Sequence, residues 1–84
     1  MSAKHKRTLA AIFEDPVRSN LPWLEIEAML EAAGAEITDG AGSRVRIALN
    51  EVRAVFHRPH PQKETDRGAI KSMRRFLSEA GVTP

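Results

Sequence analysis

The sequence contains no cysteine, and its apolar residues form no long run. Without cysteine the chain has no disulfide framework, no thiol nucleophile and no zinc site with cysteine ligands. Its apolar runs are far shorter than the roughly 18 residues that a membrane helix needs. The basic N-terminal stretch ends in Glu14 and Asp15, which makes it a poor signal peptide. We therefore expect a cytoplasmic protein with no membrane as partner.

Charge is distributed unevenly along the chain. Residues 1–40 hold four Lys and Arg against seven Asp and Glu, whereas residues 41–84 hold nine against four. The basic second half favours a polyanion as partner, although surface solubility alone explains such an asymmetry equally well. A chain of 84 residues has room for one hydrophobic core, so we expect residues 1–84 to form a single domain.

Two segments in the first half carry apolar residues at helical spacing. Residues 5–15 form the first of them. The second begins after the capping pair Ser19-Asn20, with Pro22 in its first turn, and Gly34 ends it as a C-cap. Its charged side chains are expected on or beside the solvated face of the helix, and a binding role is the alternative to a purely solvated surface. These are Glu25, Glu27 and Glu31.

A third helical pattern closes the chain. We predict Thr65 as its N-cap, with Asp66 suited to the helix dipole, and Gly81 follows its last turn. Its apolar residues gather on one stripe and its basic residues on another face. A chain-closing amphipathic helix of this kind is expected to pack against a sheet.

Three strands lie between the second and the third helix. Residues 35–38 form a short first strand, and the flexible turn DGAGS follows at 39–43. RVRIAL at 44–49 and VRAVFH at 52–57 both alternate between apolar and polar residues. We therefore predict an α+β fold with a three-stranded antiparallel sheet, helices packed on one face and the other face free.

The last two strands read as a hairpin whose turn is Asn50-Glu51, although Glu in the second position leaves the turn type open. This turn places every apolar residue opposite an apolar one, and a shift by one residue would break that match. The outer pairs are then Ala48 with Arg53, Arg46 with Val55, and Arg44 with His57. Opposed β-carbons lie about 5 Å apart, so Arg44 and His57 should be neighbours on the open face.

The pairing of Arg44 with His57 suits the cleavage of RNA by its own 2′-hydroxyl. A histidine serves as base or acid near neutral pH, and an arginine binds the phosphate oxygens. We take His57, His60 and Arg44 as the candidate catalytic residues. The alternative is that a histidine at a strand end before proline is only a surface residue.

Further residues are candidates for contacts with the RNA backbone. The glycine-rich turn offers backbone N–H groups at Gly42 and Ser43. The basic candidates are Arg46, Arg53, Arg58, Lys63, Lys71 and Arg74. We expect no cofactor and no metal site, because two histidines without convergent carboxylates make a weak ligand set.

Four stretches of the sequence together resemble one family. They are WLEIEAMLEAAGA (23–35), GSRVRIALN (42–50), VFHRPHP (55–61) and FLSEAGV (76–82). In their order and spacing they resemble the HicA toxins of bacterial type II toxin–antitoxin systems. The resemblance covers residues 20–84 and leaves residues 1–19 as a helical extension.

The resemblance implies a fold similar to a double-stranded-RNA-binding domain. It also implies a toxin that cuts mRNA, with a HicB-type antitoxin as partner. Domains of this fold recognise the backbone and shape of RNA rather than its bases. An open face lined with arginines is consistent with that mode.

In one position the sequence departs from the pattern of the family. HicA toxins typically carry their catalytic histidine after the Gly-Ser turn, where this chain has Arg44. Either His57 has taken over the role, or the cleavage apparatus differs, or the chain is an RNA-binding module without chemistry. A scaffold that only binds a partner protein is the remaining alternative.

Overall fold

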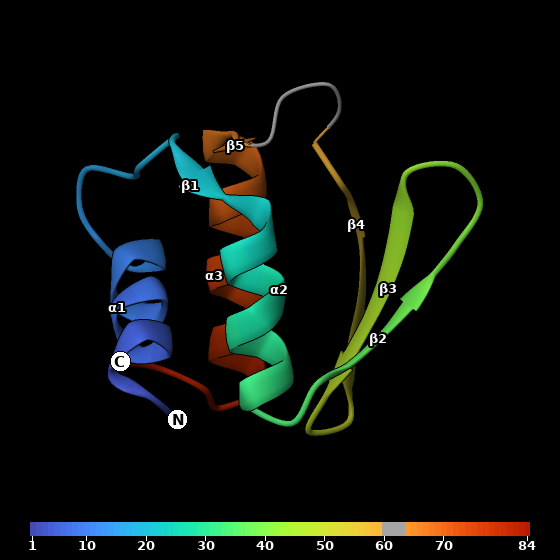
Figure 1. Cartoon of the computed structure of the whole chain (residues 1–84), viewed down its shortest axis with the longest axis horizontal. Helices are drawn as coiled ribbons and strands as arrows, with labels where there is room; N and C mark the ends of the chain where they lie inside the picture. The colour runs from blue at the N-terminus through green and yellow to red at the C-terminus, as the bar shows by residue number, and fades with distance from the viewer. Residues whose placement is uncertain (60–63) are drawn as a thin grey trace.

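The computed structural model describes residues 1–59 and 64–84. Its elements are, in order, α1 (Ala3–Ile12), β1 (Leu21–Pro22), α2 (Trp23–Ala32), β2 (Glu36–Asp39), β3 (Arg44–Leu49), β4 (Val52–His57), β5 (Glu64–Thr65) and α3 (Arg67–Glu79) (Figure 1). The predicted α+β fold, with three helices and a three-stranded antiparallel sheet in the described part of the chain, is confirmed. The sequence pattern does not predict β1 and β5, which pair antiparallel with each other.

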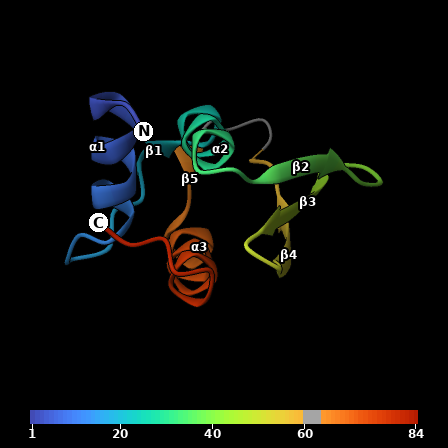
Figure 2. The ribbon, with the colours of Figure 1, turned by 90° about the horizontal axis from the view of Figure 1, so that it is seen from below.

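The sheet has the strand order β2-β3-β4, and the helices lie on one side of it. Figure 2 shows α2 and α3 between the sheet and α1, so α1 forms an outer third layer. No helix among the described residues covers the opposite face of the sheet, as the alternation of the strands predicts. Both ends of the chain lie near α1 (Figure 1).

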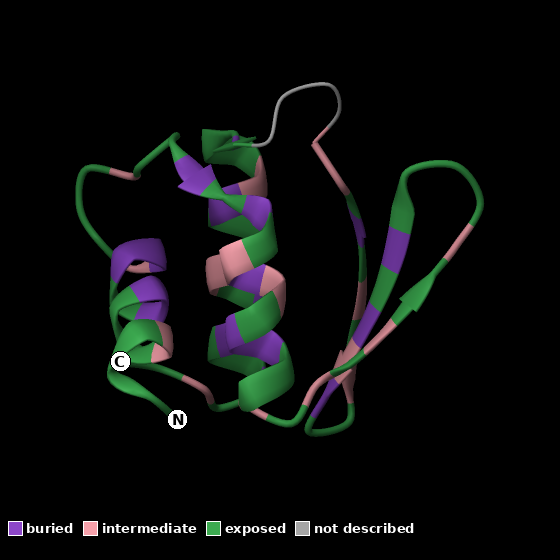
Figure 3. Ribbon diagram, in the orientation of Figure 1, coloured by how far each residue is buried: buried purple, intermediate pink, exposed green. Residues whose placement is uncertain are grey.

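The hydrophobic core lies between the sheet and the two helices that cover it, and it continues between these helices and α1 (Figure 3). Val45, Ile47 and Leu49 of β3 are buried, as their alternation predicts. From α1, Leu9 and Ile12 belong to the same cluster of buried residues. The N-terminal helix therefore contributes to the core. The division of the chain into an extension, residues 1–19, and a core domain, residues 20–84, stays a prediction.

The first two helices begin and end at different residues from those that the sequence pattern indicates. α1 begins after Ser2, whose hydroxyl accepts a hydrogen bond from the His5 N–H, and it ends at Ile12 rather than near residue 15. α2 has Pro22 as its N-cap and no side-chain capping bond. The predicted capping pair Ser19-Asn20 is therefore wrong, because the strand β1 lies between this pair and the helix.

The N-cap of α3 is Asp66, not Thr65 as predicted. The Asp66 carboxylate accepts a 2.8 Å hydrogen bond from the Ala69 N–H. Thr65 is fully buried in β5 and lies opposite Leu21 of β1. This pairing with a distant segment holds Thr65 in an extended backbone, so the helix starts later.

The hairpin of β3 and β4 has the predicted register at every pair, from Leu49 opposite Val52 to Arg44 opposite His57. The period-2 alternation of two consecutive strands was enough to fix it, because any shift would expose the apolar residues. The open face therefore carries the expected arginines next to the expected histidine.

The hairpin turn is of type I′, since Asn50 and Glu51 both have positive φ, at 49° and 69°. The Asn50 side chain also donates a 2.9 Å hydrogen bond to the carbonyl oxygen of Ala80, at the end of α3. One residue thus closes the hairpin and ties it to the helical layer.

Replacing Glu51 with glycine should stabilise the protein. At a φ of 69° a residue with a Cβ is strained, so we expect Glu51→Gly to raise the free energy of unfolding by about 0.5–1 kcal/mol. Urea denaturation measures the change. Asn50→Gly is the control and should gain less, because it also loses the bond to Ala80. A lower stability for Glu51→Gly would contradict the strain argument.

Candidate functional site

The hairpin turn decides which side chains of the open face lie closest together. Beyond a two-residue turn, hydrogen-bonded and non-hydrogen-bonded pairs alternate along the ladder, starting with a bonded pair. A 2.9 Å bond from the Arg58 N–H to the Ser43 carbonyl, just beyond Arg44 and His57, fits this alternation. All open-face pairs of β3 and β4 are therefore non-hydrogen-bonded, with Cα atoms about 4.5 Å apart and side chains closest.

Arg44 and His57 form the pair at the end of the hairpin that lies farthest from its turn. Both side chains are exposed. A guanidinium and an imidazole held on adjacent strands at this spacing can contact the same phosphate group. The structure thus brings together two of the three candidate catalytic residues.

The loop before β3 keeps the surroundings of Arg44 open. Gly42 has a φ of 63°, which favours glycine. A Cβ at Gly40 would lie only 3.2 Å from the Cβ of Arg44, so a glycine leaves that space free. Among the described residues, the N–H groups of Gly42 and Ser43 have no hydrogen-bond acceptor. They can therefore bind an anion beside Arg44.

A shallow groove of about 410 Å³ lies on the open face. Arg46 and Arg53 line it together with Glu36 and Thr38 of β2. Val55 also lines the groove, and 57% of it is exposed. Two of the basic RNA-binding candidates thus flank an apolar side chain, on the same face as Arg44 and His57.

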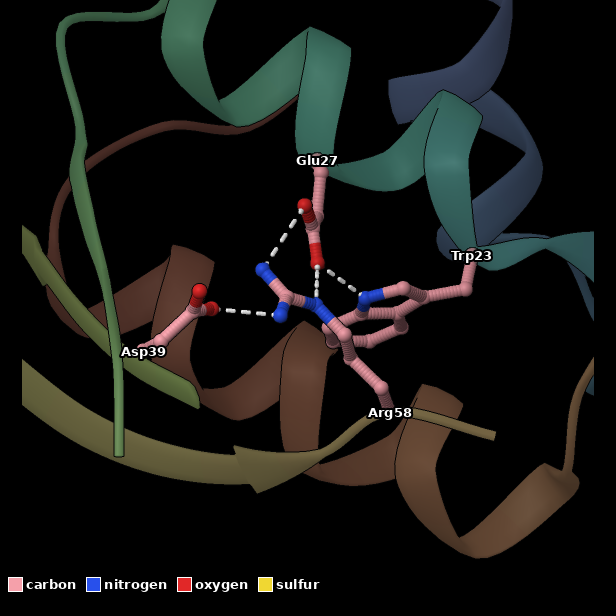
Figure 4. Close-up of polar contacts among 4 residues, drawn as sticks. All are labelled: Trp23, Glu27, Asp39 and Arg58. Atoms are coloured by element: carbon pink, nitrogen blue, oxygen red, sulfur yellow. Dashed lines mark hydrogen bonds and ion pairs between the residues drawn. The ribbon is translucent and has the colours of Figure 1, made fainter. Parts of the chain in front are cut away.

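Arg58 stands at the centre of a polar network that joins three segments (Figure 4). Its Nε lies 2.7 Å from a carboxylate oxygen of Glu27 in α2, and its Nη1 lies 2.5 Å from one of Asp39 in β2. The indole N–H of Trp23 donates to the same Glu27 carboxylate. The hydrogen bond to Glu27, followed by the one to Asp39, raises the pKa of Arg58 and so favours its charged form further.

This network corrects the expectation for Glu27. Only 14% of its side chain is exposed, so it does not lie on a solvated face. The partner that draws it inward is Arg58, 31 residues further along the chain, and no local pattern reveals such a contact. Arg58 is one of the predicted RNA contacts. Its side chain is 36% exposed and donates to two carboxylates, so it connects the end of β4 to α2 and β2.

Arg74 lies apart from Arg44 and His57. Its guanidinium donates to the carbonyl oxygens of Ile12, at 3.0 and 3.1 Å, and of Glu14, at 2.8 Å. It thus satisfies backbone acceptors at the end of α1, on the side of the helical layer away from the sheet. Lys71, by contrast, lines a groove between α3 and β4 that Arg53 also reaches.

Two candidates, His60 and Lys63, lie outside the described residues. Within residues 1–59 and 64–84, no group of three or more His, Asp or Glu side chains could hold a metal ion. None of the helices in this part of the chain has the length and apolarity needed to cross a membrane.

Fold and surface define a class of small α+β protein, with helices behind a three-stranded sheet and arginines and a histidine on its free face. A family model described as the HicA toxin of bacterial toxin–antitoxin matches residues 23–82. The chain therefore belongs to the HicA toxin family, as the sequence motifs indicate, and it is the toxin of a pair with an antitoxin. Comparisons with curated proteins and with solved structures find no match.

Proposed function

We propose that the chain is an endoribonuclease that cuts mRNA without a metal ion and thereby arrests growth. The observation that carries the proposal is the cross-strand pair of Arg44 and His57, exposed at the edge of a basic sheet face in a toxin family member. The pair supplies the proton-transfer group and the cation that RNA cleavage needs. A HicB-type antitoxin is the proposed partner that holds the activity in check.

The reaction follows from these groups. One histidine removes the proton of a 2′-hydroxyl, whose oxygen then attacks the adjacent phosphorus. The bond to the 5′-oxygen breaks, and the leaving oxygen takes a proton from an acid. His57 and His60 share the roles of base and acid in this proposal. Arg44 and the N–H groups of Gly42 and Ser43 stabilise the negative charge that develops on the phosphate.

The RNA backbone would lie along the open face of the sheet. Arg46 and Arg53 project from the same face and supply phosphate contacts. The apolar Val55 between them can take the face of a base or a ribose. Lys71 and Lys63 remain candidates for RNA contacts at the border of this face. Arg58 and Arg74 contribute by stabilising the fold through their hydrogen bonds.

The experiment that tests the proposal uses the purified chain and a single-stranded RNA in EDTA. We expect fragments on a denaturing gel, with a 2′,3′-cyclic phosphate at the new 3′ ends, because the nucleophile is the 2′-hydroxyl. Intact RNA in the presence of the folded protein would contradict the proposal.

A second candidate function is an RNA-binding module without chemistry. The observation that favours it is Arg44 itself, which stands after Gly42-Ser43 where the family resemblance places a histidine. In that case RNA affinity should fall steeply with salt.

The binding surface is tested through Arg46. Whether or not the chain cuts RNA, we expect Arg46→Ala to weaken RNA binding several-fold and to reduce its salt dependence by about one charge, because a phosphate contact is lost. Fluorescence anisotropy of a labelled RNA at several salt concentrations measures both. Arg67→Ala at the start of α3 is the matched control, since Arg67 is exposed but lies outside the sheet face. Equal effects of the two substitutions would argue against this surface.

A further inference from the structure

In residues 1–59 and 64–84, no strand pairs with the outer edge of β4. Arg53, Val55 and His57 belong to the non-hydrogen-bonded pairs of the ladder. Their backbone N–H and C=O groups therefore point away from β3. Within the described part of the chain, no other segment forms hydrogen bonds with these groups. The edge thus presents three donors and three acceptors in the spacing of a β-strand.

Apart from the charge of Arg53, this edge lacks the features that protect edge strands. β4 pairs with β3 over residues 52–57 without a bulge, and no proline or acidic residue lies in this range. The opposite edge strand, β2, differs because it carries the exposed acidic residues Glu36 and Asp39. An edge strand without a bulge, a proline or an acidic residue is a template for pairing with another strand.

A groove of about 290 Å³ runs beside this edge, between β4 and α3. Phe56 and Phe76 line it, and their rings meet edge to face with centroids 6.0 Å apart. Its charged lining consists of Arg53, Lys71, Arg75 and a single carboxylate, Glu79. A strand added to β4 would therefore lie in a positively charged groove with an apolar wall.

We infer that an extended acidic segment of the antitoxin adds to β4 as the fourth strand of the sheet. The inference rests on the antitoxin partner named in the proposed function. An acidic strand matches both features at once: its backbone pairs with the free donors and acceptors, and its carboxylates pair with Lys71 and Arg75. RNA fits less well, because its phosphates only accept hydrogen bonds, whereas a peptide backbone offers a donor and an acceptor at the spacing of the free strand edge.

Such docking would also explain how the antitoxin inhibits the toxin. The added strand runs past the backbone of His57, because that residue belongs to the free edge. Side chains of a strand bound there would project beside His57 on the open face and compete with an RNA backbone at this position. Strand addition and RNA cleavage are therefore expected to exclude each other.

Amide hydrogen exchange of the full chain, followed by NMR, tests the inference. The probe is a capped seven-residue peptide of alternating glutamate and valine, and the control is the same peptide with lysine in place of glutamate. We expect the glutamate peptide to slow the exchange of the Arg53, Val55 and His57 amides at least about tenfold. The amides of Ala54 and Phe56, already bonded to β3, should change little.

Two substitutions separate the backbone from the charge contribution. Val55→Pro removes a donor that points outward and keeps the ladder with β3, so it should abolish peptide binding, whereas Val55→Thr should retain it. The double variant Lys71→Glu/Arg75→Glu should weaken binding at least about tenfold. Lys6→Glu in α1, far from the groove, is the matched control and should bind like the parent.

Three outcomes would overturn the inference: no protection at the three amides, equal protection by the lysine peptide, or protection of the groove by a 12-nucleotide single-stranded RNA and not by the peptide. The last outcome would assign the groove to RNA. The ribonuclease proposal is judged separately on the gel, since a chain that cuts RNA but binds no peptide keeps its enzymatic function and loses only this docking site.

Discussion

His57→Ala should reduce RNA cleavage by at least about 100-fold and remove the growth arrest proposed for expression of the chain, because the proton-transfer group is lost. The side chain is exposed, so the free energy of unfolding should change by no more than about 0.5 kcal/mol. Initial rates of cleavage in EDTA measure the first effect and urea denaturation measures the second.

The chain offers a matched histidine as control for this substitution. His5 lies in α1, on the far side of the helical layer from the sheet, so His5→Ala should cut RNA like the parent. His60→Ala tests the second histidine of the proposal, and we expect it to reduce cleavage as well. If both His57→Ala and His60→Ala cut RNA at the parental rate, the catalytic assignment is wrong.

Arg58→Ala should lower the free energy of unfolding by about 2 kcal/mol, the largest stability effect that we expect from a single charged residue. The substitution leaves the Glu27 carboxylate, of which 14% is exposed, without its charged partner. It also releases Asp39 of β2 from the end of β4. Arg58→Lys should restore only part of the loss, because a lysine cannot bond both carboxylates with a planar fork.

A double-mutant cycle shows whether the effect belongs to the network. If it does, Glu27→Gln combined with Arg58→Ala costs less than the two single changes added together. Arg44→Ala is the matched control, an exposed arginine outside the network on the neighbouring strand, and should leave stability nearly unchanged. Additive effects of Glu27→Gln and Arg58→Ala would show that the two side chains act independently.

The two predictions are connected through the backbone. Arg58 follows His57 directly, and its N–H is bonded to the Ser43 carbonyl while its side chain reaches α2 and β2. Its position therefore limits the motion of the histidine on the open face. Arg58→Ala should lower the cleavage rate as well as the stability, even at temperatures where the variant is fully folded.

The hairpin is the part of the fold that the sequence determined most completely. Alternation in β3 and β4 and a two-residue turn leave one register that buries all apolar residues, and the structure has this register. The juxtaposition of Arg44 and His57 follows from it without further information. The three helices were likewise predictable from periodicity, since each buries an apolar stripe.

Only the tertiary structure decided where these elements begin and which charges are buried. Thr65 resembles an N-cap in its local context, but its pairing with Leu21 holds it in a strand and transfers the cap to Asp66. Glu27 resembles a solvated helix residue, but Arg58 draws it inward over 31 positions of the chain. Local sequence determines periodicity and turns because neighbouring residues share them. A contact between distant segments has no local pattern, because it depends on how the whole chain packs.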